Sequence, residues 1–424
     1  MKGDTDITPR KTRVPLLALL AANGISMTGN VLAMIAVPWF VLQTTGSASL
    51  TGLTATFTAL PAILAAFFGG TLTDRMGFKR MSVISDVLSG LTVALIPLLY
   101  QLLGAHFAFW QLLALVFLGA LLDAPGGTAR LSLLPDVTLL AGMRLERANA
   151  AAQAIGRASN LLGAPLAGVL IALVGASNAL WLDAASFAVS ALMIALLVPS
   201  PSAEQAAKRR AGYLEDLKEG LRFIRRDPLI FATVATVMLT NFLDGPLFAV
   251  IMPVYVNREF GSALNLGLII AGFGAGATLG TIIFGAIGHR LPRRMTFALS
   301  FIVVGLQFFF LATLPPLGFI VLAFALLGLA SGPLNPIILT VMQERVPPEL
   351  RGRVFGTMTA GAYLAVPLGM FLAGLMVEWK GVRTTLLIQA CIYLIITLSL
   401  LVNPALGGMD EGRTLSAKAE RSKQ

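Results

Sequence analysis

Twelve apolar stretches, each long enough to cross a membrane as a helix, recur along the whole of this 424-residue chain. About 20 helical residues, at roughly 1.5 Å each, span a hydrocarbon core of about 30 Å. Lipid offers the backbone no hydrogen-bonding partners, so each stretch is predicted to be a helix that satisfies its own amide groups. The first six lie near residues 15–43, 50–72, 81–103, 109–133, 150–173 and 178–199. The second six lie near residues 229–256, 266–287, 295–314, 318–341, 354–377 and 383–402.

The composition argues against several classes of protein. With 56% hydrophobic and only 12% charged residues, the chain has more apolar surface than a water-soluble core can bury, so membrane lipid is its expected solvent. A single cysteine, Cys391, and two histidines argue against an internal disulfide and a cysteine- or histidine-based metal site. No G-x-x-x-x-G-K-[ST] loop is present, which argues against an ATP-driven motor in the chain. We therefore expect no cofactor and no metal. We also expect no enzymatic activity, because the sequence shows no nucleophile paired with a base.

The net charge of +10 indicates membrane orientation rather than nucleic-acid binding. If the N-terminus is cytoplasmic, the cytoplasmic segments hold 26 of the 31 lysines and arginines, and the outer loops hold only three. Because positive residues gather on the cytoplasmic side, the chain is predicted to be a multi-pass protein of the cell inner membrane with both termini in the cytoplasm. A cleaved signal peptide at residues 2–22 is disfavoured, since the apolar run continues to Leu42.

The two groups of six stretches are related to each other. A shift of 215 residues without gaps aligns eight identical residues, most of them at turns, such as Pro38 with Pro253. Hydrophobicity alone does not select glycine, proline and arginine, so we infer a duplication. The predicted fold is an all-α membrane protein of two pseudo-symmetric six-helix bundles, at residues 1–199 and 229–403, followed by a cytoplasmic tail at 404–424.

Residues 200–228 form the predicted cytoplasmic linker between the bundles. Tyr213, Leu217, Leu221 and Ile224 fall on one helical face amid charged residues, which predicts an amphipathic helix at the membrane surface. Parallel repeats of this kind place the substrate site between the two bundles, near the membrane midplane.

The loop after the second stretch carries the most specific motif of the chain. It reads Gly70-Thr-Leu-Thr-Asp74-Arg75-Met-Gly77-Phe-Lys-Arg, and a degenerate copy around Arg290 follows in the second half. The chain here resembles the major facilitator superfamily, whose loop pattern is G-x-L-x-D-R-x-G-R-[KR]. The resemblance implies a major facilitator fold in which this loop is a conformational latch that stabilises the outward-open state.

The latch also has expected partners. Asp136, at the inner end of the fourth stretch, occupies the position expected for the partner of Arg75, and Glu344 could serve Arg290 in the same way. Charge-assisted contacts of this kind hold one conformation of a helix pair. A solvated, positively charged loop is the alternative interpretation.

Shorter motifs, in a consistent order and spacing, cover nearly the whole chain. They occupy residues 25–30, 60–61, 147–149, 182–187, 219–228, 351–356 and 367–369. Together they are similar to motifs of the drug-efflux branch of the superfamily, which includes macrolide efflux proteins and the enterobactin exporter. The fifth stretch also carries Gly163-Ala-Pro165-Leu-Ala-Gly168, close to a glycine-proline element that exporters of the superfamily share. The resemblance implies export, and a packing kink without a coupling role is the alternative.

Charged residues inside the stretches are functional candidates, because each costs roughly 2.5 to 3.5 kcal/mol at the centre of a membrane helix. Asp123 and Arg157 are predicted to lie at similar depth and could form a pair. Arg130, seven residues from Asp123 on the same helical face, is the alternative partner. Asp244 has no basic residue near it in sequence. We expect Asp123 or Asp244 to take up a proton, with Arg157 moving between carboxylate and substrate, although a fixed buried ion pair is the alternative for Asp123.

Polar side chains at helical spacing predict which helix faces line a cavity. Three such stripes lie on the first, fifth and seventh stretches, and their members are Asn23, Ser26 and Asn30, then Gln153 and Asn160 around Arg157, then Thr240 and Asn241 beside Asp244. Amides and hydroxyls with few charges suit an amphipathic organic molecule. The remaining intramembrane carboxylates, Asp86 and Asp183, are predicted to be structural.

These patterns together predict a secondary transporter that works by alternating access. Its expected activity is the export of small amphipathic organic molecules of the drug, antibiotic or siderophore class, by proton antiport. Its expected partners are that substrate, the proton and membrane lipid, and the chain is expected to act as a monomer. An importer or uniporter, a lysophospholipid transporter and a non-transporting membrane sensor stay open as alternatives.

Overall fold

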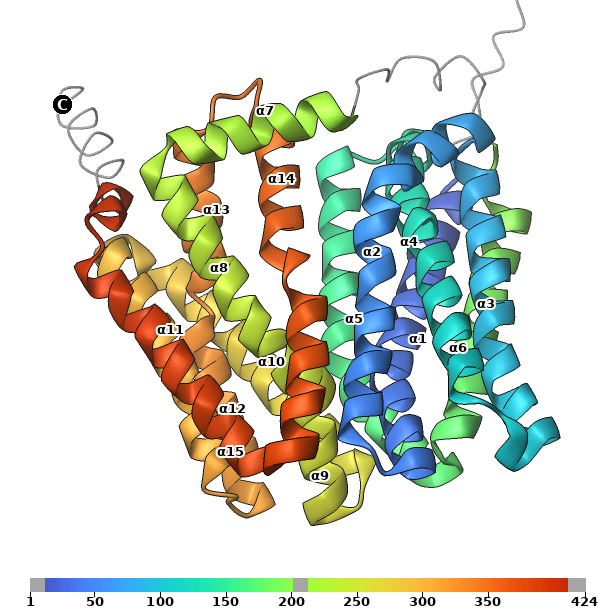
Figure 1. Cartoon of the computed structure of the whole chain (residues 1–424). Coiled ribbons are helices and arrows are strands. Elements are labelled where there is room, and N and C mark those ends of the chain that lie inside the picture. The colour runs from blue at the N-terminus through green and yellow to red at the C-terminus, as the bar shows by residue number, and fades with distance from the viewer. Residues whose placement is uncertain (1–11, 201–212, 411–424) are drawn as a thin grey trace, which may run out of the picture. The chain divides into compact units, whose positions relative to one another are not determined.

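The first half of the chain is a series of six long helices (Figure 1). The computed structural model describes residues 12–200 and 213–410, without the side chains of residues 62, 65–75, 105 and 213–216. The six helices are α1 (Val14–Thr45), α2 (Ala48–Met76), α3 (Phe78–Leu103), α4 (Phe109–Leu140), α5 (Leu145–Val174) and α6 (Ala176–Leu197), and a 3-10 turn, η1 (Gly104–His106), follows α3.

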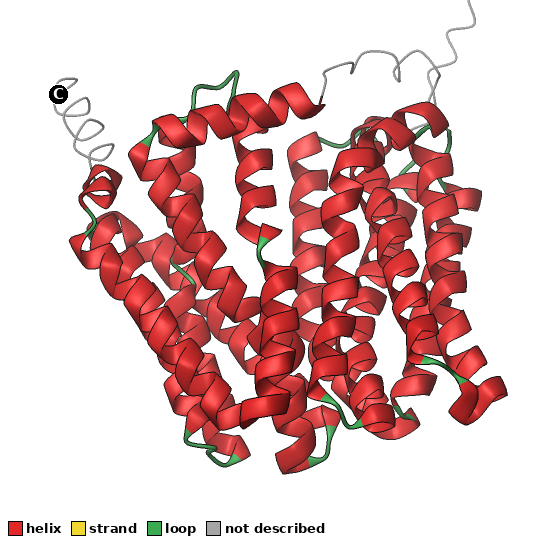
Figure 2. Ribbon diagram, viewed as in Figure 1, coloured by secondary structure: helices red, strands yellow, loops and turns green. Residues whose placement is uncertain are grey.

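The second half is also helical, and the described residues contain no strand (Figure 2). It begins with α7 (Tyr213–Arg226), α8 (Pro228–Pro246), a π-helical turn η3 (Leu247–Ile251), α9 (Met252–Phe260) and α10 (Ala263–Ile287). It continues with η4 (Gly288–Arg290), α11 (Arg293–Ala312), α12 (Leu317–Ser331), α13 (Leu334–Arg345), α14 (Arg351–Leu364), α15 (Val366–Val402) and η5 (Pro404–Met409).

The helices account for the predicted membrane spans. Ten helical segments of the described chain are long and apolar enough to cross a membrane, and α8, η3 and α9 together form one of them. Another, Arg351–Val402, is broken at Gly381, where the backbone leaves helical geometry with φ of 80°. With that break, and with the 29-residue α2, the helices match the twelve predicted stretches.

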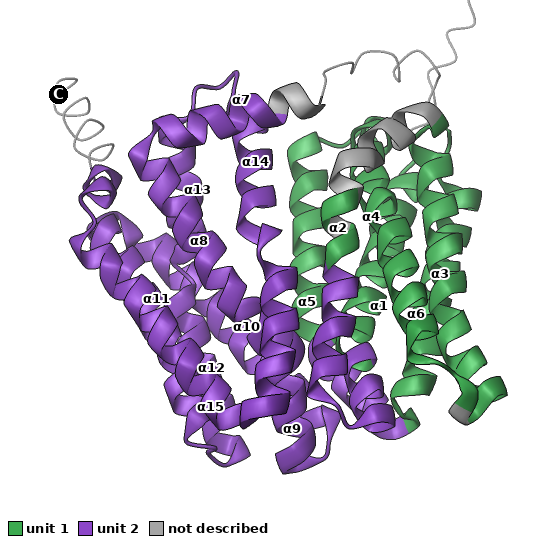
Figure 3. Ribbon diagram, viewed as in Figure 1, with its two compact units in different colours: residues 1–36, 60–163, 174–210 green, residues 37–59, 164–173, 211–424 purple. Residues whose placement is uncertain are grey.

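Two compact units divide the described chain (Figure 3). Unit 1 comprises residues 1–36, 60–163 and 174–210, and unit 2 comprises residues 37–59, 164–173 and 211–424. Unit 2 therefore contains one end of the first two helices and of α5 in addition to the second half of the chain. The predicted bundle boundaries at 199 and 229 follow the duplication instead, and they stay a prediction.

The core of unit 1 forms where α1, α4 and α6 meet. Leu19, Leu133 and Ile194 come from these three helices and are almost completely buried in one cluster. α3 packs against both α4 and α6. This packing fixes the rotation of α3 and α4, and so it decides which of their polar side chains face each other.

Unit 2 contains a helix contact in which glycines lie at the points of closest approach. α10 packs along α12, where a β-carbon on Gly280 would lie 2.1 Å from the carbonyl oxygen of Leu329. A β-carbon on Gly328 would lie 2.1 Å from the carbonyl oxygen of Phe273. Small residues of this kind let membrane helices approach at backbone distance.

The turns between helices retain the signature of the duplication. Gly46 and Gly261, which the 215-residue shift aligns, both have positive φ, at 67° and 64°. Gly175 and Gly381 have φ of 83° and 80° and lie 206 residues apart. The repeat therefore extends to the last pair of helices of each half, after a net loss of nine residues that a gapless comparison misses.

α7 lies within residues 200–228, where the amphipathic linker helix is predicted, and packs against α14. Glu219 on α7 forms an ion pair with Arg353 on α14. A β-carbon on Gly220 would lie 2.8 Å from the Arg353 carbonyl oxygen, so the two backbones nearly touch. Ile224 on the same face is buried. α7 is therefore docked on a spanning helix of unit 2.

Candidate functional site

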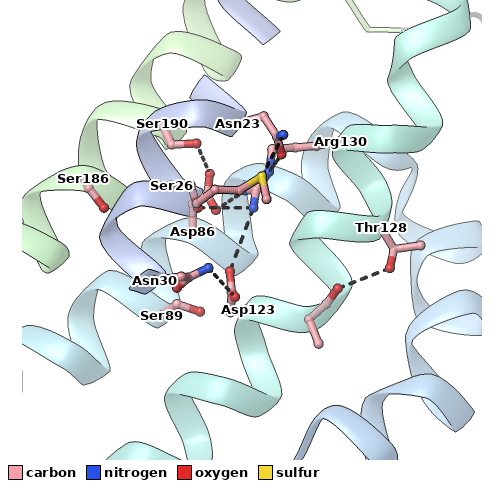
Figure 4. A network of polar contacts seen from close by, with 12 residues as sticks. Asn23, Ser26, Asn30, Asp86, Ser89, Asp123, Thr128, Arg130, Ser186 and Ser190 are labelled. Carbon is pink, nitrogen blue, oxygen red and sulfur yellow. Dashed lines mark hydrogen bonds and ion pairs between the residues drawn. The ribbon is translucent and has the colours of Figure 1, made fainter. Parts of the chain in front are cut away.

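Arg130 on α4 is the centre of a polar network in unit 1 (Figure 4). Its side chain is 3% exposed, and its guanidinium lies 2.5 Å from a carboxylate oxygen of Asp86 on α3. The same guanidinium donates hydrogen bonds to the amide oxygen of Asn23 and to the hydroxyl of Ser26 on α1, at 3.2 Å each. A carboxylate oxygen of Asp123 on α4 lies 3.9 Å away. One arginine thus connects three helices inside the apolar part of the unit.

Asp86 is the fully neutralised carboxylate of this network. Its side chain is completely buried, and its second oxygen accepts a hydrogen bond from the hydroxyl of Ser190 on α6 at 2.6 Å. Both oxygens therefore have close donors, and one of those donors carries the compensating charge. A buried pair with this geometry fixes α3, α4 and α6 together, in keeping with the structural role expected for Asp86.

Asp123 is less well compensated than Asp86. Its side chain is 25% exposed, and one oxygen accepts a hydrogen bond of 2.9 Å from the amide of Asn30 on α1. The other oxygen has only the 3.9 Å contact with Arg130, whose short contact goes to Asp86. Two carboxylates therefore share one guanidinium, and Asp123 is the less neutralised of them, because its second oxygen is buried and has no hydrogen-bond partner.

Arg157 lies apart from this network. Its side chain on α5 is exposed, as are Gln153 and Asn160, and Asn160 donates a hydrogen bond to the Gly156 carbonyl of its own helix. Of the two partners considered for Asp123, the structure brings Arg130 to it and not Arg157. The three α5 side chains stay candidates for a cavity lining, whereas the hydrogen bonds of the α1 stripe in the described residues connect it to α4.

Gly29 on α1 lies directly beside the acid of α6. A β-carbon on Gly29 would lie 2.5 Å from a carboxylate oxygen of Asp183 and 2.0 Å from the hydroxyl of Ser186. Ser186 is 3.5 Å from the same Asp183 oxygen, and the other oxygen of this fully buried carboxylate has no hydrogen-bond partner. The motifs at residues 25–30 and 182–187 thus meet across α1 and α6, where only glycine leaves room for the carboxylate.

A second candidate site is a pocket of about 460 Å³ within unit 2. Ligand pockets in proteins usually hold roughly 300 to 1,000 Å³. The lining comes from α8, η3 and α10 to α15, and its members are Val237, Thr240, Asn241, Asp244, Phe248, Phe273, Phe301, Val304, Gln307, Ser331, Leu334, Asn335, Ile338, Met358, Thr359, Ala362, Tyr363 and Tyr393. Among these lining residues Asp244 is the single carboxylate, and none is basic.

Asp244 is held in this pocket by two neutral donors. One carboxylate oxygen accepts a hydrogen bond of 2.7 Å from the amide of Gln307 on α11, and the other accepts one of 3.2 Å from the hydroxyl of Tyr393 on α15. Gln307 and Tyr393 are completely buried. Thr240 and Asn241 line the same pocket but bond to backbone carbonyls, of Thr236 and Ala362 respectively. No basic side chain of the described chain forms an ion pair with Asp244 in the structure.

The backbone around Asp244 departs from a regular α-helix. Pro246 has no N–H to donate to the carbonyl of Phe242, and the π-helical turn η3 follows immediately. A β-carbon on Gly369 of α15 would lie 2.3 Å from that Phe242 oxygen, and one on Gly245 would lie 2.7 Å from Val366. α15 therefore packs directly against the irregular turn and positions the carboxylate.

The predicted latch of the first half is only partly described. The side chains of Gly70, Asp74 and Arg75 lie outside the described residues, so their contacts with Asp136 stay a prediction. Asp136 itself is half-buried on α4. Gly77 has φ of 81° between α2 and α3, a conformation that glycine adopts without strain.

The second copy of the loop uses a different arginine from the predicted one. Glu344 on α13 forms a two-pronged ion pair with Arg293, at 2.7 and 3.0 Å, and not with Arg290. Arg290 is exposed on η4, and its Nε donates to the ring of His289 at 3.2 Å. The reason is Pro292, which separates the short η4 from α11 and leaves Arg293 as the first residue of α11.

Glu378 on α15 makes a contact that the sequence did not indicate. Its carboxylate accepts hydrogen bonds from the backbone amides of Ala48 and Ser49, at 2.7 and 3.2 Å, at the N-terminus of α2. A helix N-terminus favours negative charge, because its amides have no acceptors within the helix. One turn further, a β-carbon on Gly52 would lie 2.8 Å from the α-carbon of Gly374. We call this pairing the α2–α15 contact.

A related contact joins α5 to α10, again through glycine. A β-carbon on Gly267 would lie 2.6 Å from the carbonyl oxygen of Ala164, and one on Gly168 would lie 3.3 Å from the α-carbon of Gly267. Gly267 is the repeat equivalent of Gly52, and Gly374 lies 206 residues after Gly168. The α5–α10 contact is therefore the α2–α15 contact repeated, and it includes the glycine-proline element at 163–168.

No group of three or more histidine, cysteine, aspartate or glutamate side chains in the described residues is arranged to hold a metal ion.

Spanning helices in two related sets, with carboxylates and amides held inside them, are typical of a multi-pass membrane transporter. The family model of the Major Facilitator Superfamily matches residues 19–248 and 234–415. The chain belongs to this superfamily, and the family and fold predicted from its motifs are confirmed.

Relatives of this chain carry names that refer to drug efflux. A protein named multidrug efflux pump Tap, from Mycolicibacterium fortuitum, is 34% identical over 377 residues, which cover 88% of this chain and 92% of that protein. The protein of the same name from Mycobacterium tuberculosis is 34% identical over 89% of this chain and 90% of its own length. Macrolide efflux protein A from Streptococcus pyogenes is 20% identical over 91% of this chain and 95% of its own.

Solved structures share the fold at low sequence identity. The nucleoside transporter NupG, as its D323A mutant, has a TM-score of 0.76 and 16% identity over 91% of this chain and 99% of its own. The D-xylose-proton symporter has a TM-score of 0.69 and 14% identity over 92% of this chain and 97% of its own. These similarities support the fold alone.

Proposed function

We propose that this chain is a drug-efflux transporter of the inner membrane that exports small amphipathic organic molecules in exchange for protons. The observation that carries the coupling is Asp123, an intramembrane carboxylate that shares one arginine with Asp86 and has one oxygen without a hydrogen-bond partner. Such a group gains or loses a proton at lower cost than one enclosed in a complete ion pair.

The direction of transport rests on the relatives. Two proteins named multidrug efflux pumps match nearly the whole chain at 34% identity. The glycine-proline element of α5 supports the same direction through its similarity to the element that exporters of the superfamily share. The orientation with both termini in the cytoplasm follows from the distribution of lysine and arginine.

The α2–α15 and α5–α10 contacts support alternating access. In the proposed orientation both lie toward the outer ends of their helices, while the loop with Gly77 and the Glu344–Arg293 pair lie toward the cytoplasm. Contacts held by glycine and one carboxylate can separate without exposing a large apolar surface. We infer that they close the outer side of the transporter and break when it opens outward.

The proton gradient supplies enough energy for this task. One proton that moves down 100 mV releases about 2.3 kcal/mol, which corresponds to roughly a fifty-fold concentration ratio of substrate.

The test measures proton movement in everted membrane vesicles that contain the protein. Vesicles are energised, a panel of antibiotics, dyes and siderophores is added, and the internal pH is followed with a fluorescent indicator. We expect an exported compound to cause proton release from wild-type vesicles. Asp123→Asn should reduce that release at least ten-fold while the protein remains folded and inserted.

Glu146→Gln is the matched control, because Glu146 is a 76%-exposed carboxylate at the start of α5. It should behave as wild type. Wild-type proton flux in both Asp123→Asn and Asp244→Asn would refute coupling through these carboxylates. Accumulation of the compound in whole cells would indicate an importer or uniporter. Flux of lysophospholipid and of no other compound would indicate a lipid transporter. Binding of a compound without any flux would indicate a sensor.

A further inference from the structure

We propose that the pocket of unit 2 binds an organic cation, a protonated amine on an aromatic frame, with Asp244 as its counter-ion. This inference rests on the proposed export function and specifies the substrate class of one of its sites. The argument uses the charge of the pocket, its unused hydrogen-bond acceptors and its aromatic wall.

The charge of the pocket is uncompensated. Asp244 receives hydrogen bonds from Gln307 and Tyr393, which are neutral, and the described lining residues include no lysine, arginine or histidine. In unit 1, by contrast, Asp86 has Arg130 at 2.5 Å. A carboxylate enclosed without a basic partner is costly in an apolar environment, so a monovalent cation in the pocket is favoured and an anion is repelled.

Acceptor atoms outnumber donors around this carboxylate. A carboxylate has about four acceptor positions, and one short contact to each Asp244 oxygen leaves about two unused. The amide oxygen of Gln307 is buried and has no hydrogen-bond partner. A group with several N–H donors satisfies these acceptors together, which favours a protonated amine over a quaternary cation without N–H.

Part of the pocket lining is aromatic. Phe248 and Phe273 line the pocket with their ring centroids 5.2 Å apart, and both rings also contact the buried ring of Phe324. Phe301 adds a further lining ring. Aromatic faces attract cations and stack on flat apolar frames. The volume of about 460 Å³ suits one drug-sized molecule of that kind.

The test uses two probes with the same skeleton and different charge. Rhodamine 123 is a xanthene dye with amino groups and a positive charge, and fluorescein methyl ester carries oxygen in their place and no positive charge. Binding of each dye to the purified full-length protein in lipid nanodiscs is measured by fluorescence polarisation, with empty nanodiscs as the baseline. No ion gradient is present, so the measurement reports binding and not transport.

We expect the wild-type protein to bind rhodamine 123 at least ten-fold more tightly than fluorescein methyl ester. Asp244→Asn should weaken rhodamine binding at least ten-fold, whereas Glu259→Gln, which changes an exposed acid on α9 of the same unit, should leave it within two-fold. If Asp244→Asn fails to fold, Phe273→Leu should weaken binding at least three-fold, and Phe319→Leu, at a 64%-exposed position of α12, should not.

Equal affinity for the two dyes, or full rhodamine binding in the Asp244→Asn and Phe273→Leu variants, would overturn the proposal. Export is measured separately in the vesicle assay. Rhodamine binding without any export would contradict the proposed function but support the cation site. Export of other compounds without rhodamine binding would support the proposed function but contradict the cation site.

Discussion

Among single residues, Arg130 has the largest structural role in unit 1, because it neutralises a carboxylate that water does not reach. Its side chain is 3% exposed and that of Asp86 is completely buried. Removal of one partner from such a pair leaves an uncompensated charge in an apolar environment, which is far more costly than the loss of an exposed pair.

Arg130→Met should therefore destabilise the protein by about 3 to 5 kcal/mol, measured as thermal or denaturant unfolding in detergent. Asp86→Asn in the same molecule should recover part of the loss, because no buried charge then remains unpaired. Arg144→Met is the control, since Arg144 and Glu146 form an ion pair with both side chains more than three-quarters exposed. Equal effects of Arg130→Met and Arg144→Met would contradict the role given to Arg130.

Sequence alone identified the acids of unit 1 and named Arg130 as one of two possible partners of Asp123, but it did not indicate the pair of Arg130 with Asp86. Asp123 and Arg130 share a helix, so helical spacing placed them on one face. Asp86 lies 44 residues before Arg130, on a different helix, and no pattern in the sequence fixes how α3 and α4 are rotated. Arg157 was a plausible partner by depth, yet its side chain is exposed on α5, and the short contacts of Asp123 are with Asn30 and Arg130. The depth of a residue in the membrane follows from its distance along the helix, whereas the rotation of a helix about its axis depends on how it packs against its neighbours.

Among the helices, the α2–α15 contact is one of the two that we propose to separate when the transporter opens outward. Gly52 and Gly374 let the two backbones touch, and Glu378 holds the first amides of α2. The sequence predicted both spans from their apolar length, but it gave no sign of Glu378, because the contact joins residues about 330 positions apart. Nor did apolar length reveal the break at Pro246 or the exchange of Arg290 for Arg293, both of which depend on proline inside or beside a helix.

Gly374→Val should push α2 away from α15, because a β-carbon there would lie 2.9 Å from the carbonyl oxygen of Ala48. The measurement is maleimide labelling of a cysteine introduced at Ser49 in a Cys391→Ser background, and we expect labelling at least five-fold faster. Gly285→Val is the matched control, since a β-carbon on Gly285 of α10 meets nothing within 4 Å. Unchanged labelling in Gly374→Val would show that glycine is not needed for the contact.

For the whole molecule, the duplication explains why equivalent turns share one backbone conformation. Gly175 has φ of 83° and ψ of 158°, and Gly381 has φ of 80° and ψ of 163°. This region is almost closed to residues with a β-carbon. The 215-residue shift aligns identical residues in the sequence, whereas the 206-residue shift aligns turns that share a backbone conformation and follows from the structure.

Gly175→Ala and Gly381→Ala should each destabilise the protein by about 1 to 3 kcal/mol, because both force alanine into a strained conformation. Thermal unfolding in detergent would measure the two losses, which should be equal within error. Gly407→Ala is the control, since Gly407 lies in η5 with open space around it and without positive φ. A loss at only one of the two turns would contradict their equivalence.

The buried carboxylates of the two duplicated halves differ in their partners, and this difference has an evolutionary consequence. In unit 1, Asp86 and Asp123 are tied to Arg130 and α1, so a change in any of these side chains disturbs its neighbours. In unit 2, the pocket around Asp244 is lined by phenylalanines whose contacts are with other aromatic rings, without hydrogen bonds or ion pairs. Under antibiotic selection, substitutions that widen or narrow the range of exported compounds should therefore accumulate in the unit 2 wall, while the Arg130 network stays constant across variants.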